Sequence, residues 1–205
     1  MGKIAQKPPL ADLATSILTV RSRRHPHMPN PISTWLDKLL GRQQRPRRST
    51  PEKIINTFKN AVREVDEGHP KKAIKYFTEA ISASRNSAKL HHYRADAYAL
   101  AGEHEQAVID YDTAVRLNPK YPDTYLDRGN SHYQLGKLET ALKDFSEAIR
   151  LKPEWGEAFA NRAVIHTELG NAKESEADAA IAISLGVDEA KLNEMLQAAK
   201  NEAGE

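Results

Sequence analysis

The chain of 205 residues has no cysteine and no long apolar run. The absence of cysteine excludes disulfides, thiolate catalysis and cysteine-ligated metals. The longest apolar stretch, roughly residues 10–20, contains Asp12 and is too short to cross a bilayer. Arg21, Arg23 and Arg24 follow this stretch, whereas a secretory signal carries its basic residues first. We therefore expect neither a membrane-spanning helix nor a secretory signal.

The chain also lacks the short motifs of common active sites. None of its ten glycines belongs to a GxxxxGK or GxGxxG phosphate-binding motif, and there is no HExxH sequence or nucleophile elbow. We therefore expect a non-enzymatic protein with no catalytic residues and no cofactor.

Charge is unevenly distributed along the chain. Residues 1–53 hold 11 of the 30 lysines and arginines but three of the 28 acidic residues, so this arm carries about +8 and the remainder about −6. Seven of the eleven prolines also lie at or before Pro51. This composition predicts a partly disordered basic arm joined to a mildly acidic body.

The arm contains two apolar stripes at helical spacing. The second stripe follows Asn30 and Pro31, and we predict that it is the docking segment. Its residues are Ile32, Trp35, Leu36, Leu39 and Leu40. The stripes could dock on the chain's own body or a neighbouring copy, or anchor the chain at a membrane surface or on a partner. Nucleic-acid contact is less favoured because the arm lacks interleaved aromatics. We expect a cytoplasmic protein, with organellar import or peripheral membrane association through the arm as the alternative.

The body is a repeat with a period of 34 residues. Matching glycines stand at Gly68, Gly102, Gly136 and Gly170. In the third copy we expect a helix A over 123–135, a turn at Gly136 and a helix B over 138–151. Small residues recur where the two helices must approach, and large apolar residues lie between them. A single hairpin of this kind cannot bury its apolar face alone, so the copies must stack.

This pattern resembles the tetratricopeptide repeat, in which a small residue, a tyrosine-like position, Gly, Ala, an aromatic, Ala and Pro recur over 34 residues. The resemblance implies an all-α, right-handed superhelical solenoid of four helical hairpins. We divide the chain into the arm 1–53, the repeats 54–87, 88–121, 122–155 and 156–189, and a capping helix and tail 190–205. The terminal copies depart most from the pattern, as terminal repeats do.

Charged residues also recur within the repeats. Arg94, Arg128 and Arg162 share one repeat position, and Asp110, Asp144 and Asp178 share another, whereas the first repeat lacks both. We predict an Arg–Asp bridge between helices A and B of each of these three repeats.

The histidines give little indication of a chemical site. His132 and His166 occupy the position of Tyr98, so we interpret them as substituted packing rings. His92 and Asp96 are four residues apart, which is a weak indication of metal ligands. We assign no metal site from the sequence.

The resemblance further implies that helix-A residues line a concave groove that binds segments of other proteins. Carried onto this chain, the family's ligand-facing positions give a candidate set. They are Lys89, His92, Tyr93, Asp96, Asp123, Leu126, Asp127, Asn130, Tyr133, Gln134, Glu157, Asn161, Val164 and Glu168. Asn130 and Asn161 are expected to bond an extended backbone.

The best-known family members bind the acidic tails of cytosolic chaperones through a clamp of lysine, arginine and asparagine. The clamp positions here hold Phe58, Val62, Tyr93, Asp123 and Asp127 in one register, and His92, Asp96, Asp127, Glu157 and Asn161 in the other. Neither register supplies the cations that a carboxylate needs. We therefore expect a protein-binding scaffold or adaptor whose ligand, of unknown identity, is basic or neutral.

Overall fold

The computed structural model describes residues 50–203, so the apolar stripes predicted in the arm lie outside the described residues. Within this range the chain forms nine α-helices and no strand. The helices are α2 (Pro51–Asp66), α3 (Pro70–Ala83), α4 (Ala88–Leu100), α5 (His104–Leu117), α6 (Pro122–Gln134), α7 (Leu138–Leu151), α8 (Gly156–Glu168), α9 (Ala172–Ser184) and α10 (Glu189–Ala203). None of them combines the length and the apolar character that crossing a bilayer requires.

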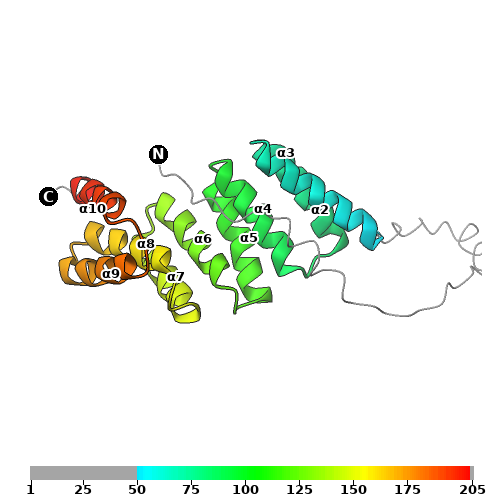
Figure 1. Cartoon of the computed structure of the whole chain (residues 1–205). Coiled ribbons are helices and arrows are strands. Elements are labelled where there is room, and N and C mark those ends of the chain that lie inside the picture. Colours follow the sequence, from blue (N-terminus) through cyan, green and yellow to red (C-terminus); the bar gives the residue numbers. More distant parts are fainter. Residues whose placement is uncertain (1–49, 204–205) are drawn as a thin grey trace, which may run out of the picture.

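The helices form four consecutive pairs, α2 with α3, α4 with α5, α6 with α7 and α8 with α9. Each pair also packs on the next one, so the described chain is an all-α solenoid (Figure 1). The expected fold class is confirmed. The helix α2 begins at Pro51, three residues before the boundary that the sequence analysis placed at 54.

Local sequence explains where the helices begin and end. Thr50 caps α2 by accepting a hydrogen bond from the amide of Lys53 at 3.3 Å, and Pro51 fills the first helical position. Between α6 and α7, Gly136 has a φ of +68°. Glycine adopts this left-handed conformation without the steric cost of a Cβ atom. The following amide, of Lys137, then bonds the carbonyl of His132 at 2.9 Å and closes the turn.

The two helices of a pair approach closely because small residues face large rings. Ala141 in α7 is completely buried. A Cβ atom on Gly129 of α6 would lie 2.7 Å from the ring of Phe145 in α7. Phe77 and Tyr111 repeat the position of Phe145, and all three rings are 1% exposed. These rings therefore fill the interior of the first three pairs, as the spacing predicts.

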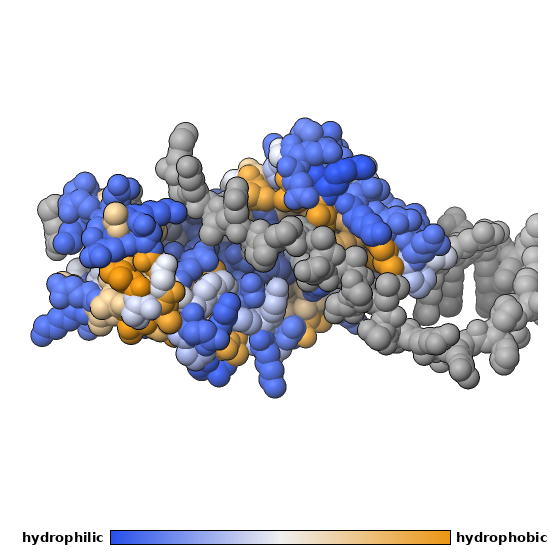
Figure 2. Space-filling model, in the orientation of Figure 1, coloured by the Kyte–Doolittle hydropathy of each residue, from blue (hydrophilic) through white to orange (hydrophobic). Residues whose placement is uncertain are grey.

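The helix α10 closes the stack at its carboxyl end by packing on α8. Its Leu192, 1% exposed, joins one apolar cluster with Phe159 and Ala160 of α8 and Ala182 of α9. The outer side of α9 remains partly apolar, with Ile181 40% exposed, and apolar residues are visible in this region (Figure 2). Thus α10 covers one side of the last pair.

Candidate functional site

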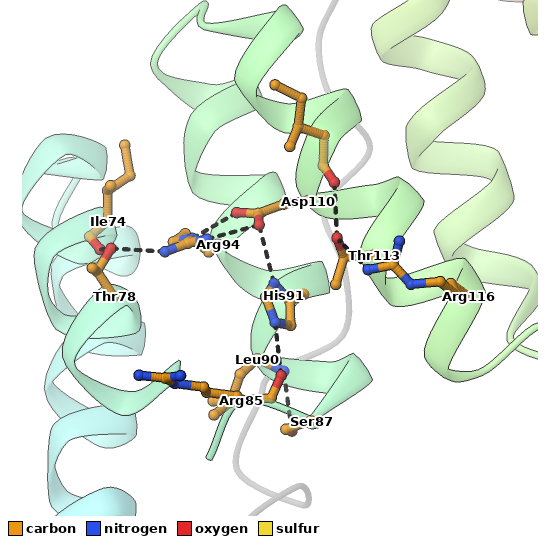
Figure 3. A network of polar contacts seen from close by, with 11 residues as sticks. Ile74, Thr78, Arg85, Ser87, Leu90, His91, Arg94, Asp110, Thr113 and Arg116 are labelled. Atoms are coloured by element: carbon orange, nitrogen blue, oxygen red, sulfur yellow. Dashed lines mark hydrogen bonds and ion pairs between the residues drawn. The ribbon is translucent and has the colours of Figure 1, made fainter. Parts of the chain in front are cut away.

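Each of the last three helix pairs contains the predicted Arg–Asp bridge. Arg94 of α4 donates to Asp110 of α5 through Nε at 2.6 Å and through Nη2 at 2.8 Å (Figure 3). Arg128 and Asp144 make the same two-pronged contact at 2.9 and 2.6 Å. Arg162 and Asp178 repeat it at 2.7 and 2.8 Å. The bridge therefore fixes helix A against helix B within a repeat, and the prediction is confirmed.

The remaining guanidinium nitrogen of each arginine reaches back to the preceding repeat. Arg94 Nη1 donates to Thr78 at 3.1 Å, and Arg128 Nη1 donates to Asp112 at 2.8 Å. Arg162 Nη1 donates to Ser146 at 3.2 Å. The three acceptors are themselves 34 residues apart, so the repeat contained a signal for these contacts that was not among the predictions. The arginines thus join three helices each and belong to the scaffold.

A second set of polar contacts joins helix A of one repeat to helix A of the next. Asn161 of α8 donates through Nδ2 to Oδ1 of Asn130 in α6 at 2.9 Å. The Tyr133 hydroxyl in α6 donates to Glu168 of α8. We call the surface along α4, α6 and α8 the A-helix surface. The two asparagines were expected to bond a ligand backbone, and in this structure they bond each other.

Four of the predicted groove residues are almost completely buried. His92, Tyr93, Leu126 and Val164 are 2%, 7%, 3% and 7% exposed. Tyr93, for example, packs against the rings of Phe58 and Phe77. These side chains pack between helices. The reason is that a residue at the edge of the groove-facing side of helix A also contacts the neighbouring helix pair.

The other predicted groove residues keep part of their surface exposed. Gln134 is exposed, and the rest are intermediate in exposure. They are Lys89, Asp96, Asp123, Asp127, Asn130, Tyr133, Glu157, Asn161 and Glu168. Lys89 is the single lysine or arginine of the set, and burial lowers its pKa. The accessible polar groups of the A-helix surface are mainly carboxylates and amides.

The structure brings a buried histidine between two carboxylates on this surface. His92 Nε2 lies 3.5 Å from Asp96 Oδ2 in the same helix and 3.7 Å from Asp127 Oδ2 in α6. The sequence indicated only His92 and Asp96, which lie in the same helix. Asp127 comes close to them because α4 packs against α6.

Two further buried residues, missed in the sequence analysis, support this cluster. The fully buried Tyr111 hydroxyl donates to Asp96 Oδ1 at 2.7 Å. The hydroxyl of Thr124, 1% exposed, lies 3.2 Å from His92 Nδ1. Burial, followed by the charges of Asp96 and Asp127, raises the pKa of Tyr111 well above its usual value of 10, so this hydroxyl keeps its proton.

Two family models match the middle of the stack. The model described as TPR repeat matches residues 95–136, and the model described as tetratricopeptide repeat matches residues 122–154. A search of curated proteins gave no match.

Solved structures share the fold over more of the chain. MamA 41-end from Desulfovibrio magneticus RS-1 is 17% identical, with a TM-score of 0.67 over 76% of this chain and 92% of that chain. The first TPR of Spaghetti (RPAP3), bound to the HSP90 peptide SRMEEVD, is 27% identical, with a TM-score of 0.58 over 61% of this chain and 99% of that chain.

The second TPR domain of human RPAP3, in complex with the HSP70 peptide SGPTIEEVD, is 29% identical. Its TM-score is 0.54 over 56% of this chain and 95% of that chain. The family models and the shared fold agree with the 34-residue period and with the stacked helix pairs. Residues 95–154 therefore contain tetratricopeptide repeats, and the described helix pairs have the fold of tetratricopeptide repeat proteins.

Proposed function

We propose that this chain is a non-enzymatic scaffold that binds a segment of another protein along the A-helix surface, and that the segment is basic or neutral. Stacked helical repeats present extended surfaces suited to such segments. Two structures of similar fold, 27% and 29% identical to this chain, hold short peptides. They support a binding role, and the chemistry of this chain's own surface indicates the kind of ligand.

The surplus of carboxylates on the A-helix surface is the observation that carries the proposal. The predicted contact residues include one lysine, Lys89, and five carboxylates: Asp96, Asp123, Asp127, Glu157 and Glu168. A surface of one charge sign attracts ligands of the other sign and repels its own. A lysine- or arginine-containing segment is therefore favoured, and an acidic one is disfavoured.

The residues at the clamp positions support the same conclusion. The peptides bound by the RPAP3 domains end in EEVD and carry acidic side chains. Recognition of such carboxylates depends on lysine and arginine donors. At those positions this chain has Asp127 and Glu157 in one register, and Asp123 and Asp127 in the other. We therefore expect a ligand of different charge from those two peptides.

The chain's own basic arm is a ligand of the right chemistry. Residues 28–50 combine the apolar stripe around Trp35 with arginines that follow Gly41. Such a segment offers apolar anchors and positive charge together, which is the usual composition of a helix that binds in a groove. The arm of the same chain or of a neighbouring copy is therefore the first ligand to test.

The test is a calorimetric titration of a peptide of residues 28–50 into the fragment 50–205. We expect binding at low ionic strength that weakens as salt rises from about 0.05 to 0.5 M, because exposed charges are increasingly screened. A peptide of the same length with the arginines replaced by glutamate should not bind.

Two charge-reversal variants test whether the peptide binds to the A-helix surface. Asp123→Lys in α6 should weaken binding, whereas Glu105→Lys, the same kind of charge change on an exposed residue of α5, should leave it unchanged. No binding of the basic peptide at low salt would rule out the arm as ligand. Preferential binding of the acidic peptide would contradict the proposed charge preference.

A further inference from the structure

The cluster around His92 departs from the repeat pattern at three buried positions. The residues that share the position of His92 in the other three repeats are Phe58, Leu126 and Ala160. Tyr111 stands where two other repeats have Phe77 and Phe145. Thr124 stands where two repeats have Leu90 and Ala158 and the first has the exposed Asn56. Polar groups thus replace apolar ones at three buried positions that meet in space. Because burying polar groups costs stability, their concentration at one place indicates a function.

The geometry of the cluster fits a single metal ion. One ligand atom from each of His92, Asp96 and Asp127 lies within 4.8 Å of the other two. Zinc ligands lie about 2.0–2.2 Å from the ion, which sets the ligand atoms about 3–3.5 Å apart. The two separations from His92 Nε2, 3.5 and 3.7 Å, approach this range. Small side-chain rotations would bring the three ligand atoms to the separations of a zinc site.

Buried hydrogen-bond partners orient two of the three ligand atoms. With the proton of His92 on Nδ1, this nitrogen donates to Thr124 Oγ1 at 3.2 Å, and the lone pair of Nε2 points toward the carboxylates. The Tyr111 hydroxyl holds Asp96 Oδ1 at 2.7 Å, and Asp96 Oδ2 lies 3.5 Å from His92 Nε2. Metal-binding histidines and carboxylates are usually held by outer partners of this kind.

We propose that His92, Asp96 and Asp127 form a binding site for a divalent transition-metal ion of the zinc type. One imidazole and two carboxylates suit Zn²⁺ and related first-row ions better than Mg²⁺ or Ca²⁺, which prefer oxygen alone. The Asp96 and Asp127 side chains are 18% and 17% exposed, so an ion can enter from the A-helix surface. The ion would join α4 to α6 and thus couple two consecutive repeats.

The test is a titration of ZnCl₂ into the full chain, followed by calorimetry, with Co²⁺ absorption as a second readout. Each variant introduces the residue of another repeat at the same position, so the helix packing is retained. The variants are His92→Leu, Asp96→Asn, Asp127→Asn and Tyr111→Phe, which copy Leu126, Asn130, Asn161 and Phe145. We expect one ion per chain, a Tm that rises with Zn²⁺, and loss of binding in the three ligand variants.

The variant Tyr111→Phe should bind Zn²⁺ about tenfold more weakly, because it removes an outer hydrogen bond and no ligand. His69→Ala is the control, since His69 with Glu64 and Glu67 is the other group of possible ligands among the described residues. Binding that is absent, that persists in His92→Leu, or that is lost in His69→Ala would overturn the proposal. Equal affinity for Mg²⁺ or Ca²⁺ would also contradict it.

Discussion

Arg128 illustrates how one residue connects three helices. Its guanidinium extends from α6 to Asp144 in α7 and to Asp112 in α5. Burial is the largest single influence and lowers the pKa of Arg128, but the hydrogen bonds and charges of Asp144 and Asp112 together outweigh it and leave this pKa raised. The carbon stem of an arginine also packs against apolar surface, and Tyr125 lies 5.4 Å beneath the guanidinium. This residue therefore contributes to the scaffold through charge and packing together.

Replacement of Arg128 by alanine should lower the free energy of unfolding by about 2 kcal/mol, because it leaves the buried Asp144 without its charged partner. Urea denaturation measures the change. Arg150→Ala is the matched control, since Arg150 is exposed and pairs with Glu147 of the same helix, so its loss should leave Tm unchanged. Peptide preference should be the same in Arg128→Ala as in the parent. An unaltered Tm in Arg128→Ala would contradict the scaffold role.

His132 should make stability depend on pH. Burial lowers the pKa of His132 below its usual 6.5, and its Nδ1 is buried with no hydrogen-bond partner within the described residues. The unfolded chain therefore takes up this proton at a higher pH than the folded chain. The free energy of unfolding should fall as the pH drops through about 6.5.

The variant His132→Tyr, which copies Tyr98, should lose this part of the pH dependence. Urea denaturation of parent and variant at about pH 7.5 and 5.5 makes the comparison. The parent should lose more stability than the variant on acidification. Equal losses would show that His132 binds its proton as readily in the folded chain as in the unfolded one.

At the scale of elements, the two helices of each pair have different tasks. Helices α5 and α7 supply the buried ring and the acidic partner of the arginine bridge. Helices α4, α6 and α8 supply the arginines and also contact each other across repeats through polar side chains. The A helices thus carry polar contacts between repeats, whereas α10 terminates the stack.

Leu192 should be the main apolar anchor of α10. Leu192→Ala should destabilise the carboxyl end by about 2–3 kcal/mol, because it leaves a cavity against Phe159 and Ala182. Hydrogen exchange of the α10 amides reports this local opening. Met195→Ala on the same helix, where the side chain is 39% exposed, should change exchange little. Equal protection of α10 in the Leu192 variant and the parent would argue against the capping role.

At the scale of the whole molecule, the 34-residue period was enough to predict the stack and the Arg–Asp bridges. These features repeat, so several copies of the sequence carry the same signal. Burial of Tyr93 and Leu126 was not predicted, because it depends on how far each helix A turns toward the adjacent pair. The approach of Asp127 to His92 was not predicted either, since the distance between successive A helices comes only from packing.

The central claim, that the A-helix surface is the binding face, can be tested by NMR chemical-shift mapping. The fragment 50–205 is titrated with the basic peptide of residues 28–50, with the charge-reversed peptide as control. We predict that shifts concentrate on accessible positions of α4, α6 and α8, such as the half-buried Asp123 and the exposed Gln134. They should include Asn130 and Asn161 as their mutual hydrogen bond adjusts. Shifts confined to α5, α7 and α9 would contradict the account.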